Sequence, residues 1–255
     1  MRVEAYLAPV LLDSGVAGAV EQALADRVSG LLHDVFAGLE RLRADTERAL
    51  STGPRDRTRL APLRGGAADL LGRPDRLVSG AGYVAEPGFL SDVAHWLQWW
   101  TTGERGPQSL DLPLDGRPGG ALDYVRQPWL TGPRASGRRQ VTGPYVDYVC
   151  SDEYVLTLSV PVRVGGAFAG IVGADVPVSR LEPHVVELHA LGRPAALVNA
   201  TGRVVVGAGG LLSGALVRDV PVAALWAGPD GEAAAAGLHR CPGELPLALL
   251  VPAQR

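Results

Sequence analysis

Lysine is absent from this chain of 255 residues, so arginine carries nearly all of its positive charge. The formal net charge is only −3, which argues against a general nucleic-acid or anionic-membrane surface. No uninterrupted apolar run of about twenty residues is present, and the sequence therefore predicts no membrane-spanning helix. The short apolar run at the N-terminus is broken by Glu4, Pro9 and Asp13 and is a poor secretory signal. We expect a free-standing, cytoplasmic protein.

Reactive and metal-binding patterns are scarce as well. The two cysteines, Cys150 and Cys241, lie far apart without metal-ligand spacing, and we interpret both as buried thiols. The sequence has no phosphate loop, no G-x-S-x-G and no His/Glu pair at metal-ligand spacing. It therefore predicts no enzyme, no catalytic residue, no metal and no cofactor. A hydrolase that uses Cys150 or a histidine is an alternative, which the lack of a paired base disfavours.

Apolar residues make up 47% of the chain, enough for one large or two small domains. The most regular segment is 14–50, where apolar residues recur at steps of three and four and charged residues fill the intervals. It predicts a helix that Asp13 or Ser14 caps and that Gly53-Pro54 ends. A helix of roughly 50 Å exceeds the needs of one small domain. We favour a spine along two stacked modules, with pairing to a second copy as an addition.

The next segments alternate between helix, strand and loop. Residues 56–73 predict a shorter helix, 76–84 a first strand and 103–120 a loop without regular structure. In the tryptophan-rich segment 95–100, alternation places Trp96 and Trp100 on one face and Trp99 on the other. Core packing is the expected role of these rings, and an aromatic wall for a cation is the alternative.

Residues 143–175 predict three consecutive antiparallel strands, over 145–150, 154–164 and 167–176, joined by two tight turns. In the second strand, alternation separates an apolar face from a face that carries Thr157 and Ser159. The first face suits a core, and the second can meet a ligand. The same alternation turns Tyr145 and Asp147 to one side, and Asp175 ends the third strand.

The run GPYVDY, the strand LTLSVPV and the ending G-x-V-G-A-D-V resemble the ligand-binding half of the Cache family, the PAS-like sensor domains of bacterial receptors. The resemblance covers residues 14–207. It implies an α/β (α+β) fold in which a long N-terminal helix precedes two PAS-like antiparallel modules, a double Cache arrangement. The implied divisions are 1–53 for the spine helix, 54–180 for a distal ligand-binding module and 181–255 for a smaller proximal β-rich module.

The proximal module is predicted from weaker patterns. Residues 177–192 suggest a connecting helix, 196–206 a hairpin about Thr201-Gly202, 211–226 a short helix and 245–252 a last buried strand. No cluster of titratable groups is apparent in this part of the sequence.

The resemblance also implies ligand-binding residues. Amino-acid-binding Cache domains carry an arginine before a Pro-Trp pair that clamps the substrate carboxylate, with a tyrosine after the tryptophan. Here Gln127 precedes Pro128-Trp129, Arg126 lies one position earlier and Leu130 replaces the tyrosine. On a strand, a one-residue slip turns a side chain to the opposite face. Arg126, Gln127 and Trp129 are candidate contacts by position, and carboxylate recognition stays open.

The ammonium half of the implied site is better preserved. Asp147 and Asp175 match the family positions that hold an amino group, and Tyr145 matches the phenol beside them. Two carboxylates and an aromatic face compensate a desolvated cation. We predict a sensor that binds an amine-bearing metabolite, an amino acid or a biogenic amine, and signals to a separate protein. The alternative is an unliganded interaction module that keeps the fold and dimerises through the long helix.

Overall fold

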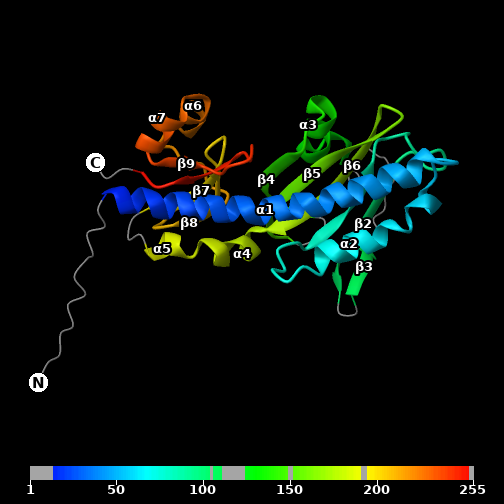
Figure 1. The fold of residues 1–255 in the computed structure, drawn as a ribbon, viewed down its shortest axis with the longest axis horizontal. Helices are drawn as coiled ribbons and strands as arrows, with labels where there is room; N and C mark the ends of the chain where they lie inside the picture. Colours follow the sequence, from blue (N-terminus) through cyan, green and yellow to red (C-terminus); the bar gives the residue numbers. More distant parts are fainter. Residues whose placement is uncertain (1–13, 104–105, 111–123, 149–151, 191–193, 253–255) are drawn as a thin grey trace, which may run out of the picture.

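A computed structural model describes residues 14–103, 106–110, 124–148, 152–190 and 194–252. It contains one long helix, α1 (Ser14–Ser51), and two antiparallel sheets. Figure 1 shows α1 running along the long axis of the molecule and passing both sheets. One apolar core joins α1 to strands of both sheets. The predicted fold class, a long N-terminal helix followed by antiparallel sheets in a mixed α+β protein, is confirmed.

The larger sheet, called the distal sheet here, has the strand order β3-β2-β1-β6-β5-β4, with every neighbouring pair antiparallel. Its strands are β1 (Gly80–Ala85), β2 (Leu97–Gly103), β3 (Gly106–Leu110), β4 (Gln140–Val146), β5 (Tyr154–Val164) and β6 (Ala167–Pro177). The strands predicted over 154–164 and 167–176 are confirmed as β5 and β6. These two strands form the longest pairing in the sheet and position most of the candidate site.

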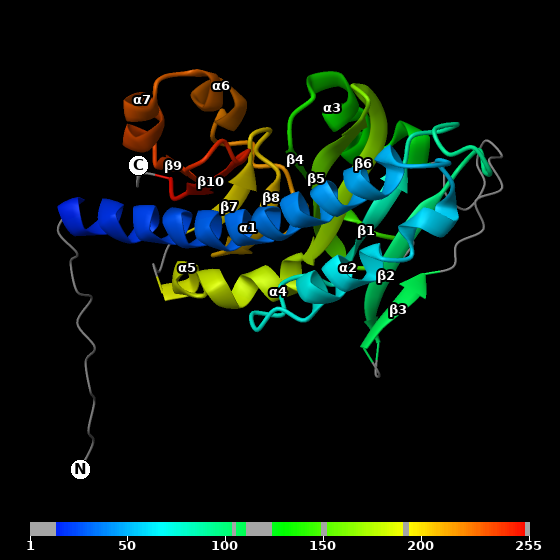
Figure 2. The same cartoon turned by 45° about the vertical axis from the view of Figure 1, so that its right-hand side comes forward.

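Alternation along the strands gives the distal sheet two different faces. Leu156 and Leu158 of β5 turn toward α1 and α2 (Leu63–Leu71) and join the main core. Figure 2 shows these two helices side by side in front of the sheet. The opposite face is covered by α3 (Pro128–Ser136), whose Leu130 packs with Trp99 of β2. We call this second face the α3 face.

The smaller sheet, called the proximal sheet, has the order β8-β7-β10-β9, and all three pairings are antiparallel. Its strands are β7 (Ala195–Asn199), β8 (Val204–Ala208), β9 (Leu238–Arg240) and β10 (Leu247–Leu250). Leu197 and Leu249 face the main core along α1. Val198 and Leu250 face a second core formed with the helices α6 (Val222–Ala227) and α7 (Asp230–Ala235). The hairpin predicted over 196–206 and the final buried strand are confirmed.

Several hydrogen bonds link the two sheets. Asn199, at the end of β7, donates its side-chain Nδ2 to the backbone oxygen of Gly143 in β4 over 2.8 Å. Gly143 has a φ of 125°, and a Cβ there would meet the backbone oxygen of Val155, so only glycine fits. Arg139, after α3, donates to the oxygen of Gly243 in the loop before β10. The proximal sheet therefore contacts the strand that carries Tyr145.

The strand predicted over 145–150 is wrong in its bounds, since β4 begins at Gln140 and ends at Val146. The chain reverses earlier than the alternation suggested. The backbone N–H of Asp147 donates to the carbonyl oxygen of Glu153 over 2.9 Å. The carbonyl oxygen of Asp147 accepts a hydrogen bond from the backbone N–H of Asp152 over 2.8 Å. These bonds place Asp147 in the turn that leads to β5. Cys150 lies outside the described residues.

The helix predicted over 56–73 is interrupted. A 3₁₀ turn, η1 (Arg57–Leu60), precedes α2, because Pro62 lacks the N–H that a continuous helix needs. The strand predicted over 76–84 begins only at Gly80. The loop predicted over 103–120 contains β3, which pairs with β2.

Three further helical segments differ from prediction. The segment around Arg126, which was considered as a strand in the sequence analysis, is helical. It consists of a 3₁₀ turn, η2 (Tyr124–Arg126), followed by α3. The connecting segment predicted as one helix consists of α4 (Val178–Leu181), η3 (Glu182–Val185) and α5 (Glu187–Ala190). Of the two short helices before β9, α6 was predicted and α7 was not.

Candidate functional site

The α3 face carries a chain of three hydrogen-bonded side chains. Thr157 of β5 donates its hydroxyl to Oδ1 of Asp175 in β6 over 2.7 Å, and the two residues are direct cross-strand partners. The hydroxyls of Tyr145 and Thr157 lie 2.5 Å apart. Because the single Thr157 hydrogen goes to the carboxylate, the Tyr145 phenol is the donor in that bond. The predicted residues Tyr145 and Asp175 are thus brought together through Thr157.

Asp147 completes an acidic pair with Asp175. Both residues are buried, with 9% and 8% of their surface exposed. Burial raises the pKa of Asp175 to about 7, the Thr157 hydrogen bond opposes this shift, and the charge of Asp147 adds to it. A ligand ammonium beside the two side chains would offset the cost of ionising Asp175. The arrangement therefore suits a cation.

Three glycines lie beside the acidic pair, and we call them the glycine floor. Gly80 and Gly82 of β1 and Gly173 of β6 share the α3 face with Asp175 by their register. A Cβ on Gly82 or Gly173 would meet the six-membered ring of Trp99 at 2.9 Å and 3.3 Å. A Cβ on Gly80 would lie 2.5 Å from Trp99 Nε1 and 3.3 Å from Asp175 Oδ2. The indole therefore lies across the glycines with its N–H edge toward Asp175.

Trp99, Thr157 and Ser159 belong to this face. The sequence predicts that Thr157 and Ser159 lie on a face that can meet a ligand, with an aromatic wall as the alternative role of the tryptophans, but it predicts none of the three as a ligand contact. Alternation separated Trp99 correctly from Trp96 and Trp100, which pack toward the main core. Polar residues inside the otherwise apolar β5 were one available signal. Glycines at matching positions of two predicted strands were another, but the pairing of β1 with β6 is set only by the fold.

The candidate contacts before α3 are placed differently from the acidic pair. Arg126 and Gln127 are exposed at the N-terminal end of α3. Trp129 is partly buried and packs with the cluster that contains Trp99 and Leu130. The structure thus brings Trp129 toward the α3 face. The arginine within α3, Arg134, forms an ion pair with Glu86 at 2.6 Å.

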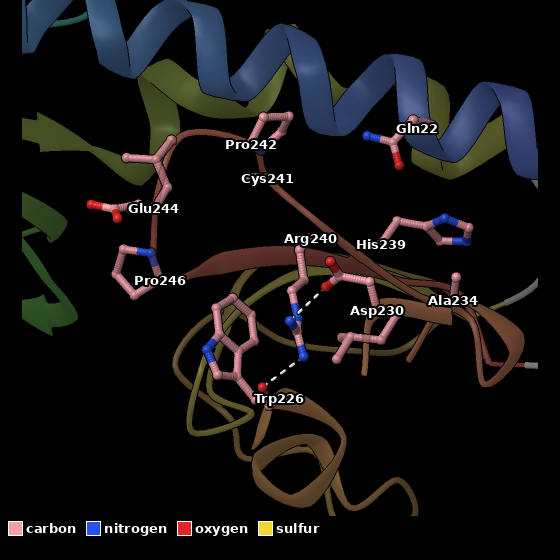
Figure 3. Close-up of a pocket in the computed structure, with 12 residues that line it drawn as sticks. Gln22, Trp226, Asp230, Ala234, His239, Arg240, Cys241, Pro242, Glu244 and Pro246 are labelled. Atoms are coloured by element: carbon pink, nitrogen blue, oxygen red, sulfur yellow. Dashed lines mark hydrogen bonds and ion pairs between the residues drawn. The ribbon is translucent and has the colours of Figure 1, made fainter. Parts of the chain in front are cut away.

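A separate cavity of about 620 Å³ lies between α1 and the proximal sheet (Figure 3). Arg240 of β9 lines this cavity, pairs with Asp230 at 2.6 Å and donates to the carbonyl oxygens of Trp226 and Gly228 at the end of α6. Its guanidinium also lies 5.5 Å from the Trp226 ring. These contacts hold α6 and α7 against the sheet, so Arg240 has a structural role here.

Nucleophilic and metal-binding groups are few in the part of the chain that the structure describes. Burial raises the pKa of Cys241 to about 12, which keeps that thiol protonated and unreactive at neutral pH. Within the described ranges, no group of three or more His, Cys, Asp or Glu side chains could hold a metal ion. None of the described helices combines the length and the apolar character of a membrane span.

Comparisons with known proteins agree with this fold. Residues 113–183 match the family model described as methyl-accepting chemotaxis protein-like, first PDC sensor domain. One similar structure is the ligand-binding domain of the Pseudomonas fluorescens chemoreceptor CtaA, solved with L-valine. It is 16% identical in sequence, the match covers 93% of this chain and 95% of that domain, and the TM-score is 0.56. A structure named methyl-accepting chemotaxis protein X is 15% identical, with 94% and 100% coverage and a TM-score of 0.55.

The ligand-binding domain of the Campylobacter jejuni chemoreceptor Tlp3, solved with 4-methylisoleucine, is 14% identical, with 79% and 74% coverage and a TM-score of 0.51. None of the curated protein sequences matches this chain. The resemblance to the Cache family is confirmed: the chain has a Cache-like sensor-domain fold, and its central segment matches a PDC sensor model.

Proposed function

We propose that this chain is a sensor domain that binds a small amine-bearing metabolite on the α3 face and communicates its presence to a separate signalling protein. Asp147 and Asp175 would hold the ammonium group, and the Tyr145 ring would cover one side of it. The site lies in the distal module, for which we propose the predicted bounds 54–180, with 1–53 as spine and 181–255 as proximal module.

The buried acidic pair is the observation that carries this proposal. The charge of the buried Asp147 adds to the cost of ionising the buried Asp175 carboxylate. Among the described residues, a threonine hydroxyl and the second carboxylate act on Asp175, and neither brings a positive charge. A ligand cation would supply charge compensation to Asp175. Domains of the same fold have been solved with L-valine and with 4-methylisoleucine, ligands that also carry an amino group.

Signalling requires that the ligand favour one of two packings of the domain, since a ligand shifts an equilibrium only by its differential affinity. Two connections lead away from the site. β5 and β6 pack against α1, which continues past the proximal sheet. Gly143, two residues before Tyr145, is held by Asn199 of the proximal sheet. A small shift of β4 or of α1 on ligand binding would therefore reach the proximal module.

The test is a thermal-shift and calorimetric screen of the protein against amino acids, polyamines, other biogenic amines and simple carboxylates. A ligand at 100 times its dissociation constant should stabilise the protein by about 2.7 kcal/mol, or several degrees. Asp147→Asn and Asp175→Asn should abolish the shift. Asp69→Asn is the matched control, because Asp69 is an exposed carboxylate on α2 and the substitution should leave binding unchanged.

Loss of binding can be separated from loss of folding. Asp175→Asn replaces a buried carboxylate with a neutral amide that never has to ionise, so this variant should melt at or above the wild-type temperature at pH 8 without ligand. If no amine shifts the melting temperature of the wild type, the ammonium site is wrong. A concentration-dependent dimer in sedimentation experiments would then favour the unliganded interaction module.

A further inference from the structure

We propose that Trp99 and Ser159 are additional ligand contacts and that they select a small organic monocation with a hydrogen-bond acceptor next to its ammonium group. Amino alcohols and amino-acid amides are such ligands. This inference rests on the proposed amine site and names the ligand class that the site would take.

The indole N–H of Trp99 is the first reason. Trp99 is 6% exposed, and its Nε1 has no hydrogen-bond partner although the atom itself is buried. An indole N–H is a donor only, and leaving a buried donor unpaired costs about 1–3 kcal/mol, roughly a 5- to 150-fold effect on an equilibrium. Trp99 Nε1 and Asp175 Oδ2 both lie close to Gly80, at 2.5 Å and 3.3 Å from the position that a Cβ would take there. One small molecule with an ammonium and an acceptor on neighbouring carbon atoms could contact both.

Ser159 is the second, independent reason. Its side chain is fully buried in β5, and its Oγ lacks a hydrogen-bond partner. Ser159 lies two residues beyond Thr157 on the same face and pairs across the sheet with Gly173, over which the Trp99 ring lies. The Ser159 hydroxyl therefore lies beside the glycines that the Trp99 indole covers. A polar ligand group at the edge of the indole would give the Ser159 hydroxyl the partner that it lacks.

Charge balance decides between a monocation and a zwitterion. The acidic pair contributes up to two negative charges, and a ligand carboxylate would lie close to them. Among the described residues around α3, Arg126 is exposed and Arg134 is already paired with Glu86. The indole N–H of Trp99 and the hydroxyl of Ser159 can donate hydrogen bonds without carrying a charge. An uncharged acceptor such as a hydroxyl or an amide oxygen therefore fits this face better than a carboxylate.

The experiment compares four head groups on three hydrocarbon skeletons, those of alanine, valine and phenylalanine. Each skeleton is offered as the plain amine, the amino alcohol, the amino amide and the amino acid, and calorimetry gives the dissociation constants. On the best skeleton, the amino alcohol or amide should bind at least about tenfold more tightly than the plain amine, as one or two good hydrogen bonds provide. It should also bind more tightly than the amino acid.

Three variants assign the preference to its residues. Trp99→Phe and Ser159→Ala should each reduce the preference for the amino alcohol or amide over the plain amine about three- to tenfold. Thermal melting without ligand shows whether each variant is folded. Trp96→Phe is the matched control, because Trp96 likewise has a buried Nε1 without a partner but packs toward the main core.

The outcomes separate this inference from the proposed function. If plain amines bind as tightly as amino alcohols and amides, or if Trp99→Phe and Ser159→Ala weaken all head groups equally, the two contacts are wrong and the amine site stands. If the amino acid binds most tightly, the monocation assignment is overturned and the amine site again stands. If none of the compounds binds, both proposals fail together.

Discussion

The two sheets of this molecule differ in the polar side chains that their faces bury. The proximal sheet is apolar on both sides: Leu197 and Leu249 face one core, and Val198 and Leu250 face another. The distal sheet is apolar only toward α1 and α2. Its α3 face buries Asp175, Thr157 and Ser159, and the Ser159 Oγ has no hydrogen-bond partner. A sheet with two apolar faces contributes to packing, whereas a buried polar sheet face is the kind of surface that a polar ligand can contact.

One charged side chain in each region sharpens this contrast. The half-buried Arg240 of the proximal sheet has an acidic partner and three carbonyl oxygens, so its charge is compensated within the protein although its Nε has no partner. Asp175 in the distal module has a threonine hydroxyl on one oxygen and a second carboxylate nearby. Its environment disfavours the ionised form. Electrostatics therefore stabilises the fold in one region, whereas in the other it would favour the cation that we propose as ligand.

The largest effect is expected from breaking the packing of the proximal sheet. Leu249→Ala removes a fully buried side chain from β10 and should lower the free energy of unfolding by about 2–5 kcal/mol, as cavity-forming substitutions do. Urea unfolding measures the loss. Amine affinity below the unfolding transition should stay within about twofold of wild type, because Leu249 lies outside the distal sheet. A large loss of affinity in the folded variant would contradict the division of roles.

A smaller effect is expected from filling the glycine floor of the distal sheet. In Gly80→Ala, the new Cβ would lie 2.5 Å from Trp99 Nε1 and must displace the indole from its place beside Asp175. Amine affinity should fall by at least about 30-fold, or about 2 kcal/mol, when measured by calorimetry.

Gly65→Ala is the control for this substitution. Gly65 lies on α2, and a Cβ there would meet nothing within 4 Å. The substitution should leave amine affinity unchanged and raise the free energy of unfolding by up to about 1 kcal/mol. Wild-type affinity in Gly80→Ala would show that the ligand lies elsewhere.

The smallest expected effect over one pH unit is the change in amine affinity with pH, which concerns the distal sheet alone. Asp175 has a pKa of about 7 in the free protein, and an ammonium ligand requires its ionised form. Affinity should therefore fall by up to about tenfold for each pH unit below 7, and binding at neutral pH should release protons, which calorimetry in buffers of different ionisation enthalpy detects. Affinity that rises toward acidic pH would contradict the assignment. Among the described residues, the Asp147 carboxylate acts on Asp175 directly, and the Tyr145 phenol is linked to Asp175 through Thr157.

The same pKa has a consequence for folding. Since the pKa of Asp175 is raised from an unfolded value near 4, the folded protein binds more protons between about pH 4 and pH 7. The ligand-free protein should lose stability as pH rises through this window. Asp175→Asn should remove that contribution, and thermal melting of both proteins across the range measures it.

Local patterns predicted the regular parts of the fold well. The repeat of apolar residues gave α1, and alternation bounded by polar or glycine turns gave β5, β6 and the hairpin of β7 and β8. Predictions failed where tertiary contacts set the conformation. β3 forms in a Gly- and Pro-rich segment because β2 offers it an edge, and β4 starts at Gln140 because β5 pairs with it from Ser159 onward.

The sequence by itself determined the long helix, the alternation that separates Thr157 and Ser159 from the core, and the presence of Tyr145, Asp147 and Asp175 near the ends of their predicted strands. These features depend on neighbours within a few residues, which local periodicity records. Only the tertiary structure decided that Gly80 lies beside Asp175, that Trp99 covers the glycines, and that Thr157 joins Tyr145 to Asp175. Strand order and register create these contacts between distant segments, and no local pattern encodes them.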